Sequence, residues 1–255
     1  MKTDHQVLPR RTVHLSIVIP VFNEAAVIGQ TLAAAVAAVA VADLEAEIIV
    51  VDGGSSDATM HSAMASTQAY AIQESCRFQI IQAPRGRAAQ MNAGAALATG
   101  DVLLFLHADT LLPAGAGRAV IDGLRNIRGL PPTPSSWGRF DVQIAGRARM
   151  LKVVARCMNL RSRLTGIATG DQAIFVTREA FAAAGGFPIQ PLMEDIALSR
   201  TLKQRCAPVC LHLKVVTSER RWECNGVWRT ILLMWTLRLR YWLGASPECL
   251  KRAYK

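Results

Sequence analysis

Residues 47–52 read Glu-Ile-Ile-Val-Val-Asp and lead into residues 53–57, Gly-Gly-Ser-Ser-Asp. A β-branched run that ends in an acid and a glycine-rich loop is typical of a buried strand that reaches a ligand-binding turn. Residues 15–20, 78–82 and 102–106 have the same strand character, and helix-compatible stretches separate them. This alternation predicts an α/β fold with a single Rossmann-like, mostly parallel sheet flanked by helices on both faces.

The second half of the chain gives weaker signals. A helix is expected from Pro113 to about Arg128, and the Pro- and Ser-rich residues 129–136 are the best linker candidate. Further predicted elements are strands at 137–145 and 172–177 and helices at 196–205 and 227–243. We therefore predict a polar N-terminal extension (1–14), one α/β domain (15–222), and a basic, amphipathic helical tail (223–255).

The composition indicates a globular protein that prefers anionic partners. Hydrophobic residues make up 51% of the 255 residues and charged residues 19%, which excludes a disordered chain. The 29 Lys and Arg against 19 Asp and Glu give a net charge of +10, which favours phosphorylated ligands, nucleic acid or an acidic membrane surface. The arginines are dispersed and no nucleic-acid motif occurs, so we expect no nucleic-acid partner.

The terminal segments and the cysteines bear on localisation. Residues 1–14 are polar, and the longest Ala/Val-rich run, residues 32–42, is well short of the roughly 20 apolar residues that a bilayer span requires. The six cysteines are scattered without a CxxC pair, which is typical of reduced thiols. We expect a cytoplasmic protein, either free or peripheral at the inner face of the membrane.

The tail leaves two interpretations open. Trp228, Trp235 and Trp242 share residues 227–243 with several arginines. Such a segment suits an interfacial helix with its apolar side in the headgroup region. It equally suits a helix that packs on the domain with its arginines in water.

In an open parallel sheet, ligands bind beyond the carboxyl ends of the strands. The first strand ends at Pro20 and is followed by Asn23 and Glu24, and the second strand delivers Asp52 and Asp57. Carboxylates at this edge can accept hydrogen bonds from a base or a ribose hydroxyl. Asp57 can equally cap the next helix.

The fourth predicted strand ends in His107-Ala108-Asp109. Because side chains alternate along an extended chain, His107 and Asp109 are expected to point the same way. This pair suits Mg²⁺ or Mn²⁺ with phosphate oxygens in the remaining positions. The alternative is that His107 packs and Asp109 starts a turn.

Five motifs in this order resemble those of family 2 glycosyltransferases, over about residues 15–222. They are Pro20-Val21-Phe22-Asn23-Glu24, Val50-Val51-Asp52-Gly53-Gly54-Ser55-Ser56-Asp57, Arg85-Gly86-Arg87 with Gln90-Met91-Asn92-Ala93-Gly94, Phe105-Leu106-His107-Ala108-Asp109-Thr110, and Met193-Glu194-Asp195. The resemblance implies a GT-A fold, a nucleotide-diphosphate sugar donor, a hydroxyl acceptor and inversion at the anomeric carbon. It also implies that residues 15–222 consist of a nucleotide-binding half (about 15–112) and an acceptor half (about 113–222).

The resemblance also implies roles for single residues. Pro20, Asn23, Glu24 and Asp52 match the positions that hold the nucleoside, and Asp57 and Asn92 lie in the matching motifs. His107-Ala108-Asp109 matches the Asp-x-Asp metal motif, and Asp195 matches the catalytic base, with Glu194 beside it as an orienting or acceptor-binding group. As an alternative, Glu194 and Asp195 are an acidic pair in the first turn of a helix.

Three departures from the family pattern matter. Asp52 is followed by Gly53 where a second acid is common, and His107 replaces the first Asp of the metal motif, which favours Mn²⁺. Processive members carry Gln-x-x-Arg-Trp, whereas this chain keeps only Arg221 and Trp222. We therefore expect a non-processive enzyme.

The remaining candidates are cations and a polar loop. Arg85, Arg87 and Arg221 have the charge to stabilise phosphates, although such arginines are often solvated surface residues. Asp171 and Gln172 suit sugar hydroxyls, or form a turn.

Two other functions compete with the transferase. A nucleotidyltransferase acting on a sugar phosphate would use the same site, but residues 20–24 offer neither the glycine-rich loop nor the lysine that triphosphates require. A non-catalytic module that binds nucleotides or membranes also fits the basic charge. The ordered motifs favour a metal-dependent hexosyltransferase-type enzyme.

Overall fold

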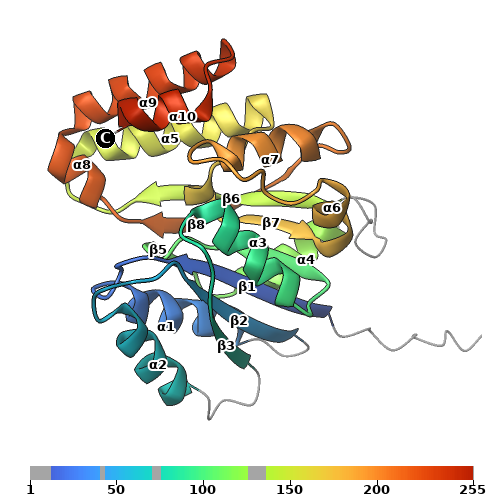
Figure 1. The fold of residues 1–255 in the computed structure, drawn as a ribbon. Coiled ribbons are helices and arrows are strands. Elements are labelled where there is room, and N and C mark those ends of the chain that lie inside the picture. Colours follow the sequence, from blue (N-terminus) through green and yellow to red (C-terminus); the bar gives the residue numbers. More distant parts are fainter. Residues whose placement is uncertain (1–12, 41–43, 71–75, 126–135, 255) are drawn as a thin grey trace, which may run out of the picture.

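The structure is a computed structural model that describes residues 13–40, 44–70, 76–125 and 136–254. The predicted linker 129–136, apart from Ser136, and residues 1–12 of the predicted N-terminal extension lie outside these ranges. Figure 1 shows helices on both faces of one twisted sheet, with the tail helices at the opposite end of the molecule from β1, β2 and β3.

The first half of the chain alternates strands and helices as predicted. Its elements are β1 (Val13–Val21), α1 (Ile28–Val39), β2 (Leu44–Asp52), α2 (Thr59–Tyr70), β3 (Cys76–Gln82), α3 (Arg87–Leu97) and β4 (Val102–Phe105). The strands are parallel, in the spatial order β3-β2-β1-β4, and Val21 of β1 lies opposite Asp52 of β2. The loops after β1 and β2 therefore start side by side at the carboxyl edge.

The second half extends the same sheet. Its elements are β5 (Thr110–Leu111), α4 (Ala116–Arg125), β6 (Trp137–Ile144), α5 (Arg149–Thr165), the 3₁₀ turn η1 (Gly170–Gln172), β7 (Ile174–Thr177), α6 (Arg178–Ala183), α7 (Glu194–Lys203) and β8 (Val209–Thr217). The full order is β3-β2-β1-β4-β7-β6-β8-β5. β7 is antiparallel to both β4 and β6, whereas β8 is parallel to β6.

Alternation along the strands divides the core between the two faces of the sheet. Ile17, Ile48 and Val50 are buried on one face, and Val18 and Ile49 are buried on the other. Helices α1, α2 and α4 cover the first face, and α3, α6 and α7 cover the second. The predicted fold, a mostly parallel sheet covered on both faces, is confirmed, and the second half adds antiparallel pairings.

Some elements differ from their predictions. The strand predicted at residues 172–177 starts at Ile174, because residues 170–172 form the 3₁₀ turn. The helix α5 and the strand β8 were not predicted. The described part of α4 ends at Arg125, and the last predicted residues of that helix lie outside the described ranges.

The helical tail consists of α8 (Arg220–Asn225), α9 (Val227–Trp242) and α10 (Pro247–Tyr254). Leu237 of α9 and Leu250 of α10 are buried together with Met193 and Ile196, at the start of α7. One side of the tail therefore packs on the domain. Among the described residues, no helix combines the length and the apolar character that crossing a bilayer requires.

Candidate active site

Hydrogen bonds join the loops after β1 and β2 into one rigid edge. The Asn23 backbone N–H donates to Ser55 Oγ and the Asn23 side-chain oxygen accepts from the Ser56 N–H, both at 2.9 Å. Asp52 is 1% exposed and accepts from the Gly54 and Ser55 N–H groups at 3.1 Å. The structure thus brings Asn23 and Asp52 together, and both support the loops through their own hydrogen bonds.

Asp57 and Glu24 flank this edge. Asp57 accepts from the N–H of Thr59, the first residue of α2, at 2.9 Å, as the helix-cap alternative predicted, and from the Ala25 N–H at 3.3 Å. Glu24 accepts from Arg220 Nη2 at 2.9 and 3.0 Å. This hydrogen bonding raises the pKa of Arg220, which Asp109 also influences.

The side-chain amides of Gln90 and Asn92 on α3 stabilise neighbouring segments of the site through hydrogen bonds. Gln90 Nε2 donates to the carbonyls of Val21 and Val51, both at 2.8 Å, which ties the ends of β1 and β2 together. The Asn92 side chain donates to the Phe187 carbonyl at 2.8 Å and accepts from the Phe187 N–H at 2.9 Å. Asn92 therefore holds the segment before α7, whereas the sequence assigned it to the nucleotide sugar.

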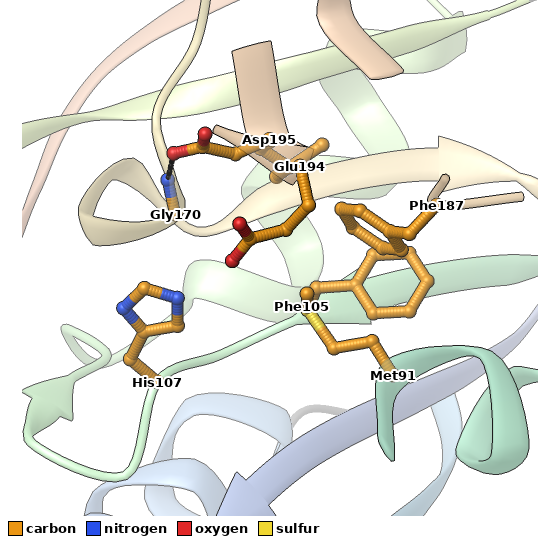
Figure 2. A pocket seen from close by; sticks show the side chains of 8 residues that line it. Met91, Phe105, His107, Gly170, Phe187, Glu194 and Asp195 are labelled. Atoms are coloured by element: carbon orange, nitrogen blue, oxygen red, sulfur yellow. Dashed lines mark hydrogen bonds between the residues drawn. The ribbon is translucent and has the colours of Figure 1, made fainter. Parts of the chain in front are cut away.

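A pocket lies beyond the carboxyl end of β4 (Figure 2). His107, Glu194 and Asp195 form its polar side. The pocket is completed by Met91, Phe105, Gly170, Ile174 and Phe187. The Phe105 and Phe187 rings meet edge to face with their centroids 4.8 Å apart, which gives one firm apolar wall. His107 and the pair Glu194 and Asp195, which are far apart in sequence, thus line one pocket.

The turn that contains Gly170 connects the two predicted motifs. The Gly170 N–H donates to Asp195 Oδ2 at 2.8 Å, and His107 Nδ1 lies 3.3 Å from Asp171 Oδ1. A Cβ on Gly170 would lie 2.2 Å from His107 Nε2, so only glycine fits at this position. The polar loop at residues 166–172 drew attention in the sequence, but nothing there singled out Gly170.

Glu194 and Asp195 point in different directions (Figure 2). The Glu194 carboxylate is 4% exposed, points into the pocket and lies 3.6 Å from Arg87 Nη1. Burial and the neighbouring Asp195 raise the pKa of Glu194, and Arg87 opposes this effect. Asp195 accepts from the Gly170 and Ile196 N–H groups, so its two oxygens are held in a fixed direction.

Other predicted site residues occupy varied places. Arg85 stacks on Phe22 with its Cζ atom 3.8 Å from the ring centroid. Gln172 is fully buried and bonded within its own turn, so it does not face a sugar. Trp222 packs on a small apolar cluster around Leu151. Arg221 lies in α8, and its side chain is outside the described part of the structure.

The sequence analysis missed Arg220, whose side chain reaches Glu24 at the site. It pairs with Glu24 and acts on Asp109 electrostatically. Asp109 itself is half-buried, and its carbonyl accepts from the Ser218 N–H at 3.1 Å, which anchors the loop after β4. The only signal in the sequence was the doubled arginine at 220–221.

Three non-glycine residues with positive φ flank these loops. They are Asn23 (φ 54°), Ala173 (φ 48°) and Met193 (φ 67°), and within the described ranges no other non-glycine residue has a positive φ. A left-handed conformation costs such residues roughly 1–3 kcal/mol, and it persists where the surroundings enforce it. The strained residues lie in the loop after β1, in the turn before β7 and at the start of α7, which are the segments that form the candidate site.

Comparisons with known proteins agree with this geometry. The family model for Glycosyl transferase family 2 matches residues 16–127. A search of curated protein sequences returned no significant match. The similar solved structures include a mannosyltransferase, PcManGT from Pyrobaculum calidifontis, in complex with GDP-Man and Mn²⁺, with a TM-score of 0.59 and 19% identity over 82% of this chain and 57% of that one.

Two further structures have the same architecture. S. aureus TarS 1-349 in complex with UDP has a TM-score of 0.60 and 16% identity over 80% of this chain and 60% of that one. Glucosyl-3-phosphoglycerate synthase from Mycobacterium tuberculosis, with Mg²⁺ and UDP, has a TM-score of 0.54 and 19% identity over 87% of this chain and 77% of that one. The chain thus spans about three fifths of the first two proteins. Residues 16–127 match the model of glycosyl transferase family 2, and the chain has the GT-A fold.

Proposed function

We propose that this chain transfers a sugar from a nucleotide-diphosphate sugar to a hydroxyl acceptor, with a divalent metal ion, with inversion and without processive polymerisation. The observation that carries the proposal is the pocket that joins His107 to Glu194 and Asp195 beyond the carboxyl end of β4. It is the position at which an open α/β sheet binds its ligand. The family match over residues 16–127 supports the chemistry.

The donor binds along the edge formed by the loops after β1 and β2. Pro20, Asn23, Glu24 and Asp52 surround the nucleoside there, on loops that are already rigid before a ligand arrives. The GDP-Man, UDP and metal ions in the similar structures support a donor of this class. Arg85, Arg87 and Arg220 add positive charge near the diphosphate.

The metal ion is Mg²⁺ or Mn²⁺, held by Asp109 and His107. Among the described residues, no cluster of three or more His, Cys, Asp or Glu side chains forms a complete protein cage. A small number of protein ligands is enough for such an ion, because Mg²⁺ in sites of this kind is bound by one or two carboxylates plus substrate phosphates. When bound, the ion stabilises the negative charge that develops on the diphosphate leaving group.

Asp195 acts as the general base. Its carboxylate is oriented by the Gly170 and Ile196 N–H groups. It takes the proton from the acceptor hydroxyl as the oxygen attacks the anomeric carbon. Attack from the face opposite the departing diphosphate inverts that carbon in one displacement. Glu194 and Arg87 position the reactants and keep water out of the apolar pocket.

The exposed side of α9 touches the membrane in this proposal. Trp228, Leu232, Trp235 and Trp242 are 67%, 66%, 69% and 72% exposed, and their spacing places them on one side of the helix. Exposed Arg229 and Arg240 supply charge that anionic headgroups attract. The chain then works at the inner, cytoplasmic face of the membrane, where such lipids concentrate.

Calorimetric titration with UDP and GDP, with and without Mn²⁺, tests the donor and the metal together. We expect one of the two nucleotides to bind with Mn²⁺ and to lose at least about tenfold in affinity with a chelator or in Asp109→Ala. Asp122→Ala is the matched control, because Asp122 is an exposed carboxylate on α4 that only pairs with Arg118. Absence of nucleotide binding, or binding that neither the chelator nor Asp109→Ala weakens, would refute the proposal.

A further inference from the structure

Two arginines from different helices approach each other behind Asp195. Arg161 lies on α5 and Arg238 on α9, and each acts on Asp195 electrostatically. The Nε and Nη2 atoms of Arg161 and the Nε atom of Arg238 are shielded from solvent and have no hydrogen-bond partner among the described residues. Side-chain donors in such surroundings are normally paired.

The neighbouring acids are already engaged elsewhere. Asp195 accepts from the Gly170 and Ile196 N–H groups at 2.8 and 2.7 Å, and Asp171 lies against His107. Asp141 is held by Arg163 and by Arg139, which is fully buried. Among the described residues, no acidic side chain lies within ion-pair distance of Arg161 or Arg238. Within the described part of the chain, the two guanidinium groups therefore feel the charge of Asp195 without forming an ion pair with it.

Burial and the adjacent Arg238 lower the pKa of Arg161 to about 10. The group stays protonated at neutral pH, but its charged form is less stable than that of an isolated arginine. Removing one of the two cations would relieve this repulsion. The pair is therefore a cost to the folded protein while no anion is present.

The surrounding packing fixes the pair in place. Leu237, next to Arg238, is buried against Met193 and Ile196 at the start of α7, and the Arg200 guanidinium stacks on Tyr241 with its Cζ atom 4.9 Å from the ring centroid. Figure 1 shows α5 and α9 at one end of the molecule and β1, β2 and β3 at the other. The helices that carry Arg161 and Arg238 thus lie at the end of the molecule away from β1, β2 and β3.

We infer that Arg161 and Arg238 form a binding site for an anionic group of the acceptor, of the phosphate class. A phosphate oxygen accepts from guanidinium groups in the planar geometry that arginine presents. An anion between the two cations would compensate their charge and occupy the unpaired donors. The acceptor then offers its hydroxyl to Asp195 while its phosphate rests on the arginines. This inference rests on the proposed function, since it takes Asp195 as the base.

Titration with inorganic phosphate tests the site directly. The donor site is first saturated with the nucleoside diphosphate and Mn²⁺, so that only a second phosphate site is measured. We expect one further site, with an affinity at least about tenfold lower in Arg161→Gln and in Arg238→Gln. Arg156→Gln on α5 and Arg252→Gln on α10 are the matched controls, because both side chains are exposed, and they should bind phosphate as the unaltered protein does.

Thermal unfolding of the same variants separates binding from a structural role. Because the charge repulsion is relieved, Arg161→Gln and Arg238→Gln should unfold at the same temperature as the parent protein or higher, without phosphate. Lower unfolding temperatures in both variants would assign the arginines to the fold and overturn the inference. Phosphate affinity that is equal in all four variants, or absent in the parent protein, would overturn it as well.

The source of the phosphate is distinguished by two further probes, glycerol 3-phosphate and hexyl phosphate. Tighter binding of glycerol 3-phosphate indicates a small soluble acceptor, and tighter binding of hexyl phosphate indicates a lipid phosphate. In either case Arg161→Gln must weaken the binding. The phosphate titrations can also be run without nucleotide, so a failed donor titration would count against the proposed function and leave this result independent.

Discussion

The donor edge, formed by the loops after β1 and β2, differs from the region between α5, α9 and α7 in how its buried polar groups are hydrogen-bonded. At the donor edge, Asp52, Asn23 and Gln90 pair with backbone groups of their own loops. Behind Asp195, donor atoms of Arg161 and Arg238 have no hydrogen-bond partner in the part of the chain that the structure describes. The buried polar groups of the donor edge are thus hydrogen-bonded before any ligand binds. The two arginines, in contrast, have donor atoms that are still available to a ligand.

This contrast has an energetic meaning. A buried donor without a partner costs roughly 1–3 kcal/mol, and more when the group is charged. Removing a buried charge should therefore destabilise the first region and leave the second as stable as before, or more so. Each region can be tested by removing one charge from it.

The largest expected effect belongs to Asp195. We expect Asp195→Asn to lower kcat by about 10²–10⁴, because the amide cannot take the acceptor proton. KM for the donor should change little, since the residues proposed to hold the nucleoside lie in the loops after β1 and β2 and not on α7. Steady-state kinetics with a confirmed donor and acceptor measure both constants.

Glu194→Gln is the comparison for that substitution. Its carboxylate points into the pocket and pairs with Arg87, so we expect a loss of about tenfold that is shared between kcat and KM. If Glu194→Gln lowered kcat more than Asp195→Asn did, the general base would be Glu194 and not Asp195.

The first half of the fold could be predicted because its signals are local. Strands β1 and β2 are short apolar runs buried on both faces, and Ile17, Val18, Ile48 and Ile49 alternate between the two core clusters. A window of a few residues is enough to recognise such runs. Asn23, Asp52 and His107 come just after or at the ends of these apolar runs. The edge of the sheet that holds the candidate site could therefore be predicted as well.

The second half lacked such signals. Strand β8 has exposed His212, Leu213 and Lys214 in its middle, which hides its alternation. Helix α5 mixes exposed Leu160 and Leu164 with several cations, so its buried side does not stand out. Both elements acquire their role from partners that are distant in sequence.

The tertiary contacts of the site also escaped prediction. The bond from Gly170 to Asp195 and the approach of Arg161 to Arg238 join different elements across long sequence separations. The choice of Arg220 over Arg221 depends on which way one turn of α8 faces. Motif matching names residue types, but it does not give directions of this kind.

The second largest effect concerns Glu47 of β2, a carboxylate that is paired within the protein as Asp52 is, although it lies away from the donor edge. This carboxylate is 5% exposed and accepts from Ser16 Oγ at 2.6 Å, Thr99 N at 2.5 Å and Thr99 Oγ1 at 2.9 Å. Glu47→Gln should lower the free energy of unfolding by about 2 kcal/mol at pH 7, because an amide replaces one acceptor oxygen by a donor. Chemical denaturation measures the loss.

The pH dependence of that loss has a definite sign. Burial of Glu47 favours the neutral acid, but the hydrogen bonds from Ser16, Thr99 and Gly100 outweigh it and lower the pKa. The stabilisation by the carboxylate is therefore complete above its unfolded pKa, roughly 4.3, and disappears as the pH falls through the lower folded value. Glu45→Gln on the same strand is the control, since Glu45 is exposed and should change stability little at any pH. A gap between Glu47→Gln and the parent that widened on acidification would contradict this account.

The smallest expected effect concerns the exposed side of α9. Replacing Trp235 and Trp242 by Ser removes two aromatic side chains that make no part of the buried contact around Leu237. We expect about tenfold weaker binding to vesicles that contain anionic phosphatidylglycerol, with unchanged thermal stability, because the lost contacts are with lipid and not with the protein. Sedimentation with vesicles measures the binding, and Met64→Ser is the control, since Met64 is an exposed apolar residue on α2, at the other end of the molecule (Figure 1). If the double variant were instead less stable and bound vesicles as well as the parent, this side of α9 would serve the fold and not a membrane.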